Sequence, residues 1–400
     1  MKYAILIGDG MGDYPIDKLD GRTPLEAADI PHMDTLARKG LLGLARTIPE
    51  GKDPGSDVAN MSIMGYDPLV YHTGRAPLEA ASMGIDLTED EVAFRLNLVN
   101  LEFKSGGQVI MRDHSADNIT TEEAAAIVDA LNHELPMVNN QKIYPGVSYR
   151  HLLVWPGLED SLPTFPPHDY RGQAVTDYLN QEGAMKILLD FIRASWPVLK
   201  KNPINIERES KGLLPANSIW PWGQGRPSPL PSYQERWGLT GAVISAVDLV
   251  KGLGKTLGLT PIEVEGATGF IDTNYEGKVR AALNALNTVD LVLVHVEAPD
   301  EAGHQGDLEK KVKAIELFDR KVVGPMFEGL KNYGEFRLAL LCDHFTPVSA
   351  MTHTPEPVPF VIYPGPTNTA RTFTEKQARS AGLYLEQGHT LIKLLLGGTK

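Results

Sequence analysis

The chain has 400 residues, of which 42% are hydrophobic and 22% charged, with a formal net charge of −13 at pH 7. This length indicates about two domains of a globular protein. The negative charge argues against a nucleic-acid or anionic-membrane surface, although bound cations could still attract an anionic substrate. The single cysteine, Cys342, excludes an internal disulfide, and no run approaches the roughly 20 apolar residues of a membrane span. We therefore expect a cytoplasmic protein.

A buried strand is the first predicted element. Residues 3–7, Tyr-Ala-Ile-Leu-Ile, form a continuous apolar run, and a glycine-rich turn that contains Asp9 follows directly. A helical pattern comes next at residues 36–38. Asp9 therefore lies just past the carboxyl end of the first predicted strand.

Ser56 follows Gly55 and opens a stretch of helical character. Its hydroxyl would lie at a helix N-terminus, where backbone N–H groups and the helix dipole favour a bound phosphate. A serine in this position is ordinarily a plain N-cap. Acidic and histidine residues farther along the chain are what favour a catalytic interpretation.

The middle of the chain, residues 90–212, has a different character. Its candidate strand at 94–101 alternates polar and apolar residues, one helix begins near 120–123, and another covers 184–199. We expect an inserted α+β domain here, with residues 1–89 and 213–400 forming one discontinuous core. The segment 213–237, rich in Pro and Trp, is predicted to be a rigid return to that core.

Three further buried strands are predicted in the last third of the chain, at 289–296, 337–342 and 358–363. An amphipathic helical pattern at 279–286 precedes the first of these strands, and another at 308–330 lies between the first and the second. Buried strands that alternate with such helices predict an α/β fold, with a mostly parallel sheet flanked by helices.

Acidic residues follow three of the predicted strands, namely Asp9, Asp300 and Asp343. Because ligands bind outside the carboxyl ends of strands in an open parallel sheet, we expect these carboxylates to lie together. Oxygen and imidazole ligands without a thiolate suit divalent cations, and two cations can clamp the oxygens of a transferring phosphoryl group. Histidines accompany the acids, and Ser56 supplies a hydroxyl that could act as the nucleophile. The predicted site consists of Asp9, Ser56, Asp300, His304, Asp343, His344 and His353.

With these residues assembled, the chain resembles the alkaline phosphatase superfamily and, more closely, the archaeal-type cofactor-independent (2,3-bisphosphoglycerate-independent) phosphoglycerate mutases. The resemblance covers nearly the whole chain. The segments that carry it are Ile7–Asp13, Gly55–Asn60, Gly65–Pro68, Thr73–Ala80, Trp222–Gly225, Asp300–His304 and Cys342–Thr354. It implies an alkaline-phosphatase-like core with a smaller inserted domain that binds substrate and closes over the site.

The resemblance also implies a reaction. Ser56 would attack the substrate phosphate to give a phosphoserine, and glycerate would then accept the phosphate on its other hydroxyl. In this way 2-phosphoglycerate and 3-phosphoglycerate would interconvert without 2,3-bisphosphoglycerate. Two divalent cations would assist, with Mn²⁺ the first choice and Mg²⁺, Zn²⁺ or Co²⁺ as alternatives. One cation would bind Asp300, His304 and His353, and the other would bind Asp9, Asp343, His344 and the Ser56 oxygen.

Arginines are the expected partners of a small anionic phosphorylated substrate, since a guanidinium can bind a carboxylate through two hydrogen bonds. The candidates are Arg75, Arg112 and Arg150, and Asp113 is a candidate proton carrier. For each arginine, a structural ion pair is the competing interpretation.

One departure from the archaeal pattern keeps other functions open. Asp117 and Asn118 precede Ile119, where those mutases tend to carry a glycine–arginine pair. The alternatives are a homoserine kinase-like phosphotransferase, as has been proposed for related bacterial proteins, and a phosphohydrolase. The lack of a recognisable nucleotide loop is weak evidence against a kinase, and an insertion able to exclude water argues against a hydrolase. The sequence leaves the oligomeric state open.

Overall fold

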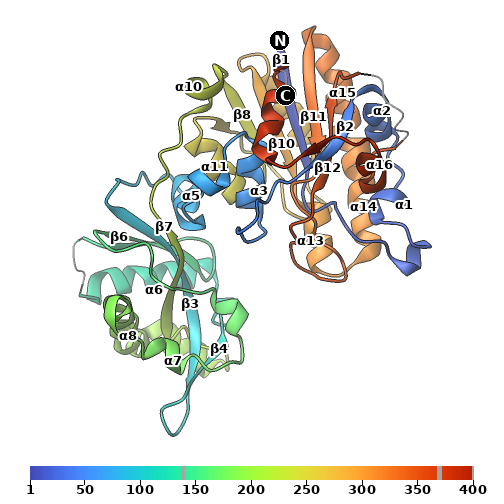
Figure 1. The fold of residues 1–400 in the computed structure, drawn as a ribbon. Helices are drawn as coiled ribbons and strands as arrows, with labels where there is room; N and C mark the ends of the chain where they lie inside the picture. Colours follow the sequence, from blue (N-terminus) through green and yellow to red (C-terminus); the bar gives the residue numbers. More distant parts are fainter. Residues whose placement is uncertain (137–139, 367–371, 399–400) are drawn as a thin grey trace. The chain divides into compact units, whose positions relative to one another are not determined.

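The computed structural model describes residues 1–136, 140–366 and 372–398, and it divides into two compact units (Figure 1). The first unit consists of Met1–His72 and Pro229–Lys400, and the second of Thr73–Ser228. Within the described ranges, no helix has both the length and the apolar character that crossing a membrane requires.

The first unit is built on a large sheet flanked by helices (Figure 1). Over the described residues the strand order is β13-β2-β12-β11-β1-β10-β8-β9. Pairing is parallel except at β12, which runs antiparallel to both of its neighbours. The strands are β1 (Lys2–Gly8), β2 (Leu41–Ala45), β8 (Gly241–Ile244), β9 (Thr260–Pro261), β10 (Leu291–Val296), β11 (Phe336–Leu341), β12 (Val358–Tyr363) and β13 (Tyr384–Leu385).

The predicted α/β fold with a mostly parallel sheet is therefore confirmed. Each of the four apolar runs forms a strand, because residues buried on both faces of a sheet are apolar at successive positions. No local pattern indicated the short strands β2 and β8, or that β12 would be antiparallel.

The helices of the first unit vary widely in length. They are α1 (Pro24–Ala27), α2 (Pro31–Lys39), α3 (Ser56–Ile63), α4 (Pro68–Tyr71), α10 (Tyr233–Trp237), α11 (Asp248–Thr256), α12 (Tyr275–Ala285), α13 (Ala298–His304), α14 (Leu308–Phe318), α15 (Gly324–Leu330), α16 (Glu375–Ser380) and α17 (Leu391–Leu395). The single helical pattern expected over 308–330 is divided, with a π-helical turn over Asp319–Val323 between α14 and α15. Pro325 has no N–H to donate to the preceding turn, so the α-helical ladder is interrupted there.

The second unit is an α+β structure centred on β3 (Glu91–Phe103). This strand pairs antiparallel with β4 (Val109–Asp113), β6 (Arg150–Pro156) and β7 (Ser218–Gly225), and β5 (Lys142–Tyr144) pairs with β6. The helices are α5 (Arg75–Ser82), α6 (Thr121–Glu134), α7 (Thr176–Leu179), α8 (Lys186–Lys201) and α9 (Pro203–Ser210). Large buried side chains such as Trp155 and Trp220 give this unit a core of its own.

The second unit extends beyond the expected 90–212 at both ends. The segment predicted as a rigid return contains β7, which pairs with β3 from Ala93 to Val99. Helix α5 packs against β3 and β7 and therefore belongs to the same unit. Pro221 inside β7 masked the strand in the sequence, because proline is rare within paired strands.

Candidate active site

The three strands that precede the predicted acidic ligands are neighbours at the centre of the large sheet. β1 lies between β10 and β11, with Ile7 aligned to Leu341 and Gly8 to Val296. The carboxyl ends of the three strands therefore meet at one edge. Asp9, Asp300 and Asp343 follow those ends, and all three residues are at least 95% buried.

Asp300, His304 and His353 form the first group of potential ligands. Helix α13 places Asp300 and His304 one turn apart, so that His304 Nε2 lies 3.2 Å from Asp300 Oδ2. His353 Nε2 lies 3.4 Å from Asp300 Oδ1 and 2.9 Å from His304 Nε2. The Nδ1 of His304 lies 3.0 Å from the carbonyl oxygen of Met351, which assigns a proton to Nδ1 and makes Nε2 the atom that would bind a cation.

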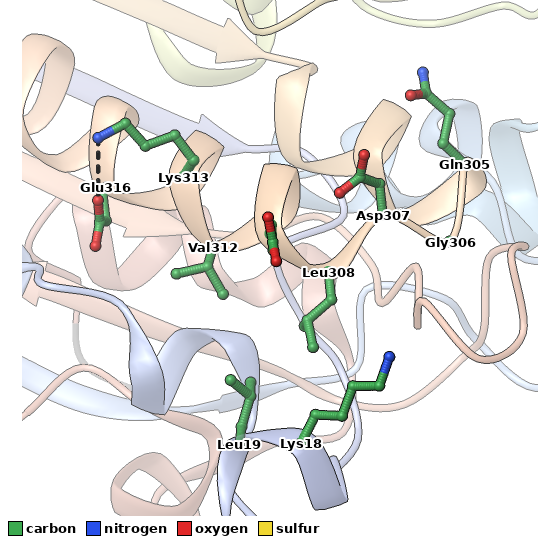
Figure 2. A pocket seen from close by; sticks show the side chains of 10 residues that line it. Lys18, Leu19, Gln305, Gly306, Asp307, Leu308, Val312, Lys313 and Glu316 are labelled. Carbon is green, nitrogen blue, oxygen red and sulfur yellow. Dashed lines mark hydrogen bonds and ion pairs between the residues drawn. The ribbon is translucent and has the colours of Figure 1, made fainter.

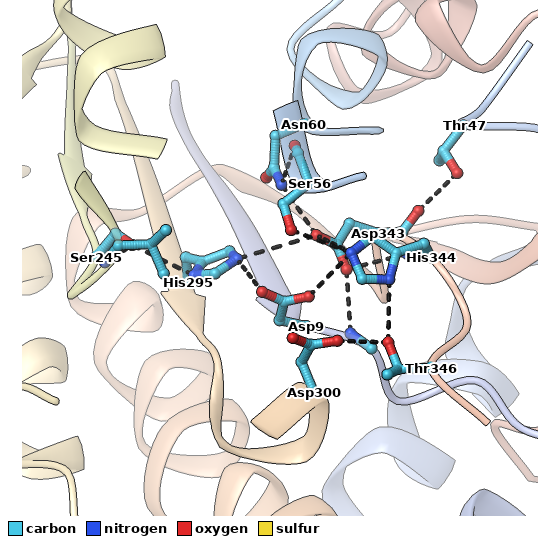
Figure 3. Close-up of polar contacts among 12 residues, drawn as sticks. Asp9, Thr47, Ser56, Asn60, Ser245, His295, Asp300, Asp343, His344 and Thr346 are labelled. Carbon is cyan, nitrogen blue, oxygen red and sulfur yellow. Dashed lines mark hydrogen bonds and ion pairs between the residues drawn. The ribbon is translucent and has the colours of Figure 1, made fainter. Parts of the chain in front are cut away.

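Asp9, Asp343, His344 and Ser56 form the second group (Figure 3). The Nε2 of His344 lies 3.3 Å from Asp9 Oδ1, 3.6 Å from Asp343 Oδ2 and 3.1 Å from Ser56 Oγ. The other carboxylate oxygen of Asp343 accepts hydrogen bonds from the backbone N–H groups of Gly10 and His344. The predicted cation ligands and Ser56 thus converge in two adjacent groups, all within the first unit.

Ser56 is the first residue of α3, after Gly55 in extended conformation at the N-cap. One turn later, the side-chain amide of Asn60 donates to the carbonyl oxygen of Ser56 at 2.8 Å and to Asp343 Oδ2 at 2.9 Å. Asn60 therefore ties the start of α3 to a predicted cation ligand. The hydroxyl of Ser56 lies at the amino end of this helix, where an anion is stabilised.

The electrostatics of these residues fit bound cations. Burial, together with the nearby charges of Asp343 and Asp300, raises the pKa of Asp9 well above its usual range. Asp9 Oδ1 receives no hydrogen bond from any described residue although it is buried. Among the described residues, Asp300–His304–His353 and Asp9–Asp300–His344 are sets whose ligand atoms lie within 4.8 Å of one another. Carboxylate and imidazole donors of this kind suit Mn²⁺, Mg²⁺, Zn²⁺ or Co²⁺.

Imidazole hydrogen bonds counter the effect of burial at Asp300. Burial by itself would raise the pKa of Asp300, but hydrogen bonds with His304 and His353 outweigh burial and hold this pKa well below its usual range. The Asp300 contact in turn raises the pKa of His304 to about 9. Without a cation, His304 therefore holds a proton on Nε2 that faces Asp300, and a bound cation would take the place of that proton.

Three polar residues of the site were missed in the sequence. His295 is fully buried on β10, with Nε2 3.1 Å from Asp9 Oδ2 and Nδ1 3.3 Å from Ser245 Oγ. Its signal was a lone imidazole in an otherwise apolar strand. Asn60 carried a weaker signal, one helical turn after Ser56, and Thr346 carried none.

The predicted substrate-binding residues lie in the second unit. Arg75 begins α5, Arg150 begins β6, and Arg112 is exposed on β4. Burial, with the positive charges of Arg75 and Arg150 nearby, lowers the pKa of Arg95 despite its 3.0 Å ion pair with Glu79. The charges of Arg75 and Arg150 thus act on Arg95, and we refer to these three residues as the cationic cluster. Arg95 was overlooked because it lies within a strand that is otherwise buried.

Asp113, the candidate proton carrier, is engaged by its own loop. Its Oδ1 accepts hydrogen bonds from the N–H and hydroxyl of Ser115 and from the N–H of Asp117. Burial by itself would raise the pKa of Asp113, but these hydrogen bonds outweigh burial and lower it. The carboxylate stays ionised in this arrangement and holds a loop in which Ala116, Asp117 and Asn118 have positive φ.

A surface pocket on the first unit contains none of the predicted site residues. It is lined by the loop before α14, by one face of that helix, and by Lys18 and Leu19 (Figure 2). Its charged groups are mixed in sign, and Lys313 and Glu316 pair with each other at 3.4 Å. The convergent polar groups that mark a catalytic site are those around Asp9.

Comparisons with known proteins agree with one another. The family model described as 2,3-bisphosphoglycerate-independent phosphoglycerate mutase matches residues 37–205. A protein of that description from Methanothrix thermoacetophila is 52% identical over 401 residues, which cover 100% of both chains. Among solved structures, a protein from Pyrococcus horikoshii has a TM-score of 0.84 and 31% identity, with 99% of this chain and 96% of that one covered. The cofactor-independent phosphoglycerate mutase from Thermoplasma acidophilum has a TM-score of 0.67 and 27% identity, with 99% of each chain covered.

Proposed function

Because the chain belongs to the family of 2,3-bisphosphoglycerate-independent phosphoglycerate mutases and is an enzyme of that kind, we propose that it interconverts 2-phosphoglycerate and 3-phosphoglycerate through a phosphoserine at Ser56, with two divalent cations. The observation that carries the proposal is the 3.1 Å approach of Ser56 Oγ to His344 Nε2 at the edge where Asp9, Asp300 and Asp343 meet.

Ser56 is the nucleophile in this proposal. Its Oγ forms a bond to phosphorus as the bond between phosphorus and the glycerate oxygen breaks. The proton lost by Ser56 is balanced by the proton that the leaving glycerate oxygen gains. The same steps in reverse, on the other glycerate hydroxyl, complete the isomerisation. When bound, the cations would neutralise negative charge on the transferring oxygens.

Asp300, His304 and His353 would hold one cation, and Asp9, Asp343, His344 and Ser56 the other. Mn²⁺ is our first choice of metal. The cationic cluster of Arg75, Arg95 and Arg150 supports an anionic substrate, and we propose that it binds the carboxylate. The one cysteine, Cys342, is a free buried thiol, so we propose a reducing compartment, the cytoplasm.

Two measurements test the function. The purified protein with Mn²⁺ should convert 3-phosphoglycerate to 2-phosphoglycerate in the absence of 2,3-bisphosphoglycerate, and activity should vanish after chelation. Mass spectrometry of protein quenched during turnover should find phosphate on Ser56. Stable phosphate on another residue would overturn the assignment of Ser56. ATP-dependent phosphorylation of homoserine, or release of inorganic phosphate, without mutase activity would overturn the proposed reaction.

A further inference from the structure

Thr346 lies between the two groups of predicted cation ligands. Its side chain is fully buried, and its hydroxyl donates a hydrogen bond to Asp300 Oδ1 of the first group. The same oxygen lies 3.2 Å from Nδ1 of His344, which belongs to the second group (Figure 3). One hydroxyl therefore contacts a ligand from each group.

The hydrogen-bond balance at this hydroxyl has one solution. A threonine hydroxyl carries one hydrogen and two acceptor lone pairs, whereas an ionised carboxylate only accepts. The hydrogen of Thr346 therefore points to Asp300, and the Nδ1–H of His344 donates to the Thr346 oxygen. The proton of the neutral His344 ring is then on Nδ1, and the lone pair of Nε2 faces Ser56 and Asp9.

The backbone around Thr346 is held firmly. Its carbonyl oxygen accepts a 2.7 Å hydrogen bond from the buried ammonium of Lys311, which also contacts Asp13 at 2.9 Å. Two glycines leave room for the side chain. A Cβ at Gly10 would lie 2.6 Å from the Thr346 hydroxyl oxygen, and one at Gly303 would lie 2.9 Å from its methyl group. The hydroxyl cannot move toward one ligand group without weakening its contact with the other.

We propose that Thr346 is a positioning residue that couples the two cation sites, so that a cation bound by Asp300, His304 and His353 strengthens binding at the site of Asp9, Asp343 and His344. This inference rests on the proposed function, because it requires that both groups bind cations. A cation that fixes Asp300 also fixes the Thr346 hydroxyl, and the hydroxyl then fixes the orientation of His344.

A double-mutant cycle tests the coupling. His304→Ala weakens the first site and leaves the Thr346 side chain unaltered. Thr346→Val removes the hydroxyl and keeps the shape of the side chain. Mn²⁺ binding is measured by equilibrium dialysis for the wild-type protein, both single variants and the double variant. We expect His304→Ala to lower affinity at the second site about fivefold or more when Thr346 is present, and to have no such effect when it is combined with Thr346→Val.

Further variants make the result specific. Thr346→Ser keeps the hydroxyl and should preserve the coupling. Thr47→Val removes another buried hydroxyl, which donates to the backbone carbonyl of Asp343 at 2.6 Å, and should leave the coupling unchanged. If Thr346→Val does not fold, as judged by its thermal unfolding, Thr346→Ala removes the hydroxyl without adding a methyl group.

The outcomes separate this inference from the proposed function. The protein could bind two cations while His304→Ala lowers affinity at the second site equally with Thr346 and with Thr346→Val. That result would overturn the coupling role of Thr346 and leave the proposed function intact. A wild-type protein that binds none of Mn²⁺, Mg²⁺, Zn²⁺ and Co²⁺ would overturn both. Coupling that is present in the wild type and in Thr346→Ser, and absent in Thr346→Val, is the supporting result.

Discussion

The Nε2 atom of His344 lies 3.1 Å from Oγ of Ser56, while Nδ1 of the same ring lies 3.2 Å from the hydroxyl oxygen of Thr346. The ring is thus held on one side and presents its free nitrogen to the serine on the other. This arrangement distinguishes Ser56 from an ordinary N-cap, because the hydroxyl faces chemically active groups at the edge of the sheet.

Replacement of Ser56 tests the nucleophile directly. Ser56→Ala should lower kcat by at least about a thousandfold, because loss of a nucleophile removes the covalent route. The fold should persist, as measured by circular dichroism. Ser62→Ala is the matched control, since Ser62 is a buried serine on the same helix α3 that, six residues on, projects from another face. Near-normal activity of Ser56→Ala would refute the phosphoserine.

Asn60 should matter although it is not a predicted ligand. Its amide donates to Asp343 Oδ2 and to the backbone of Ser56, so Asn60→Ala leaves a cation ligand and the nucleophile less well oriented. We expect a loss of roughly 10- to 100-fold in Mn²⁺ affinity or kcat. Isothermal titration with Mn²⁺ and steady-state kinetics would measure the two effects separately. If Mn²⁺ affinity and kcat are both unchanged, Asn60 contributes only to packing and orients neither the cation ligand nor the nucleophile.

The sequence indicates the site better than it indicates the architecture around it. Asp9, Asp300 and Asp343 could be placed together because each follows an apolar strand, and parallel strands end at a common edge. Strand order is not encoded in such local patterns, so the position of β1 between β10 and β11 required the structure. The roles proposed for Thr346 and Arg95 depend on neighbours far away in the chain, such as Asp300 for Thr346, and local sequence contains no trace of those neighbours.

Removal of the cations should destabilise the protein, and Asp9→Asn should reverse part of this effect. Burial and the charges of Asp343 and Asp300 disfavour an ionised Asp9, so the amide should raise the melting temperature of the chelated protein at about pH 8. Mn²⁺ at roughly 100 times its Kd should stabilise the wild type by about 2.7 kcal/mol per site. The same Mn²⁺ excess should stabilise the Asp9→Asn variant by less than it stabilises the wild type. Calorimetry with and without chelator measures both changes, and a larger Mn²⁺ gain in the variant would contradict the assignment of Asp9 as a ligand.

Arginine variants test the substrate-binding proposal. Arg75→Ala and Arg150→Ala should each raise KM for phosphoglycerate about tenfold or more, with a smaller change in kcat, because a charge-assisted hydrogen bond to substrate is lost. Arg112→Ala should be measured alongside, since Arg112 is exposed on β4. Arg193→Ala is the control, because Arg193 contacts Asp190 on the surface of α8. An unchanged KM in both Arg75 and Arg150 variants would remove the cationic cluster from the substrate site.

Glu375 should make stability depend on pH for a reason separate from the cations. The residue is only 8% exposed, and its carboxylate accepts hydrogen bonds from the Thr23 hydroxyl at 2.9 Å and the Asp13 N–H at 3.3 Å. Burial raises the pKa of Glu375 from 4.5 to about 7, even though these two hydrogen bonds act to lower it. Between those two pH values the folded protein keeps a proton that the unfolded chain has released. The free energy of unfolding therefore falls as pH rises, by about 3 kcal/mol in total.

Glu375→Gln keeps an acceptor for Asp13 and a polar partner for Thr23 but cannot ionise. Its stability advantage over the wild type should therefore grow from pH 4.5 to about 7 and stay constant above that. Urea unfolding of both chelated proteins at several pH values gives this difference, in which the titration of the cation ligands cancels because both proteins share it. Glu328→Gln, on the surface beside Lys331, should show no such trend. Parallel stability curves for Glu375→Gln and the wild type would mean that Glu375 ionises in the folded protein as freely as it does in the unfolded chain.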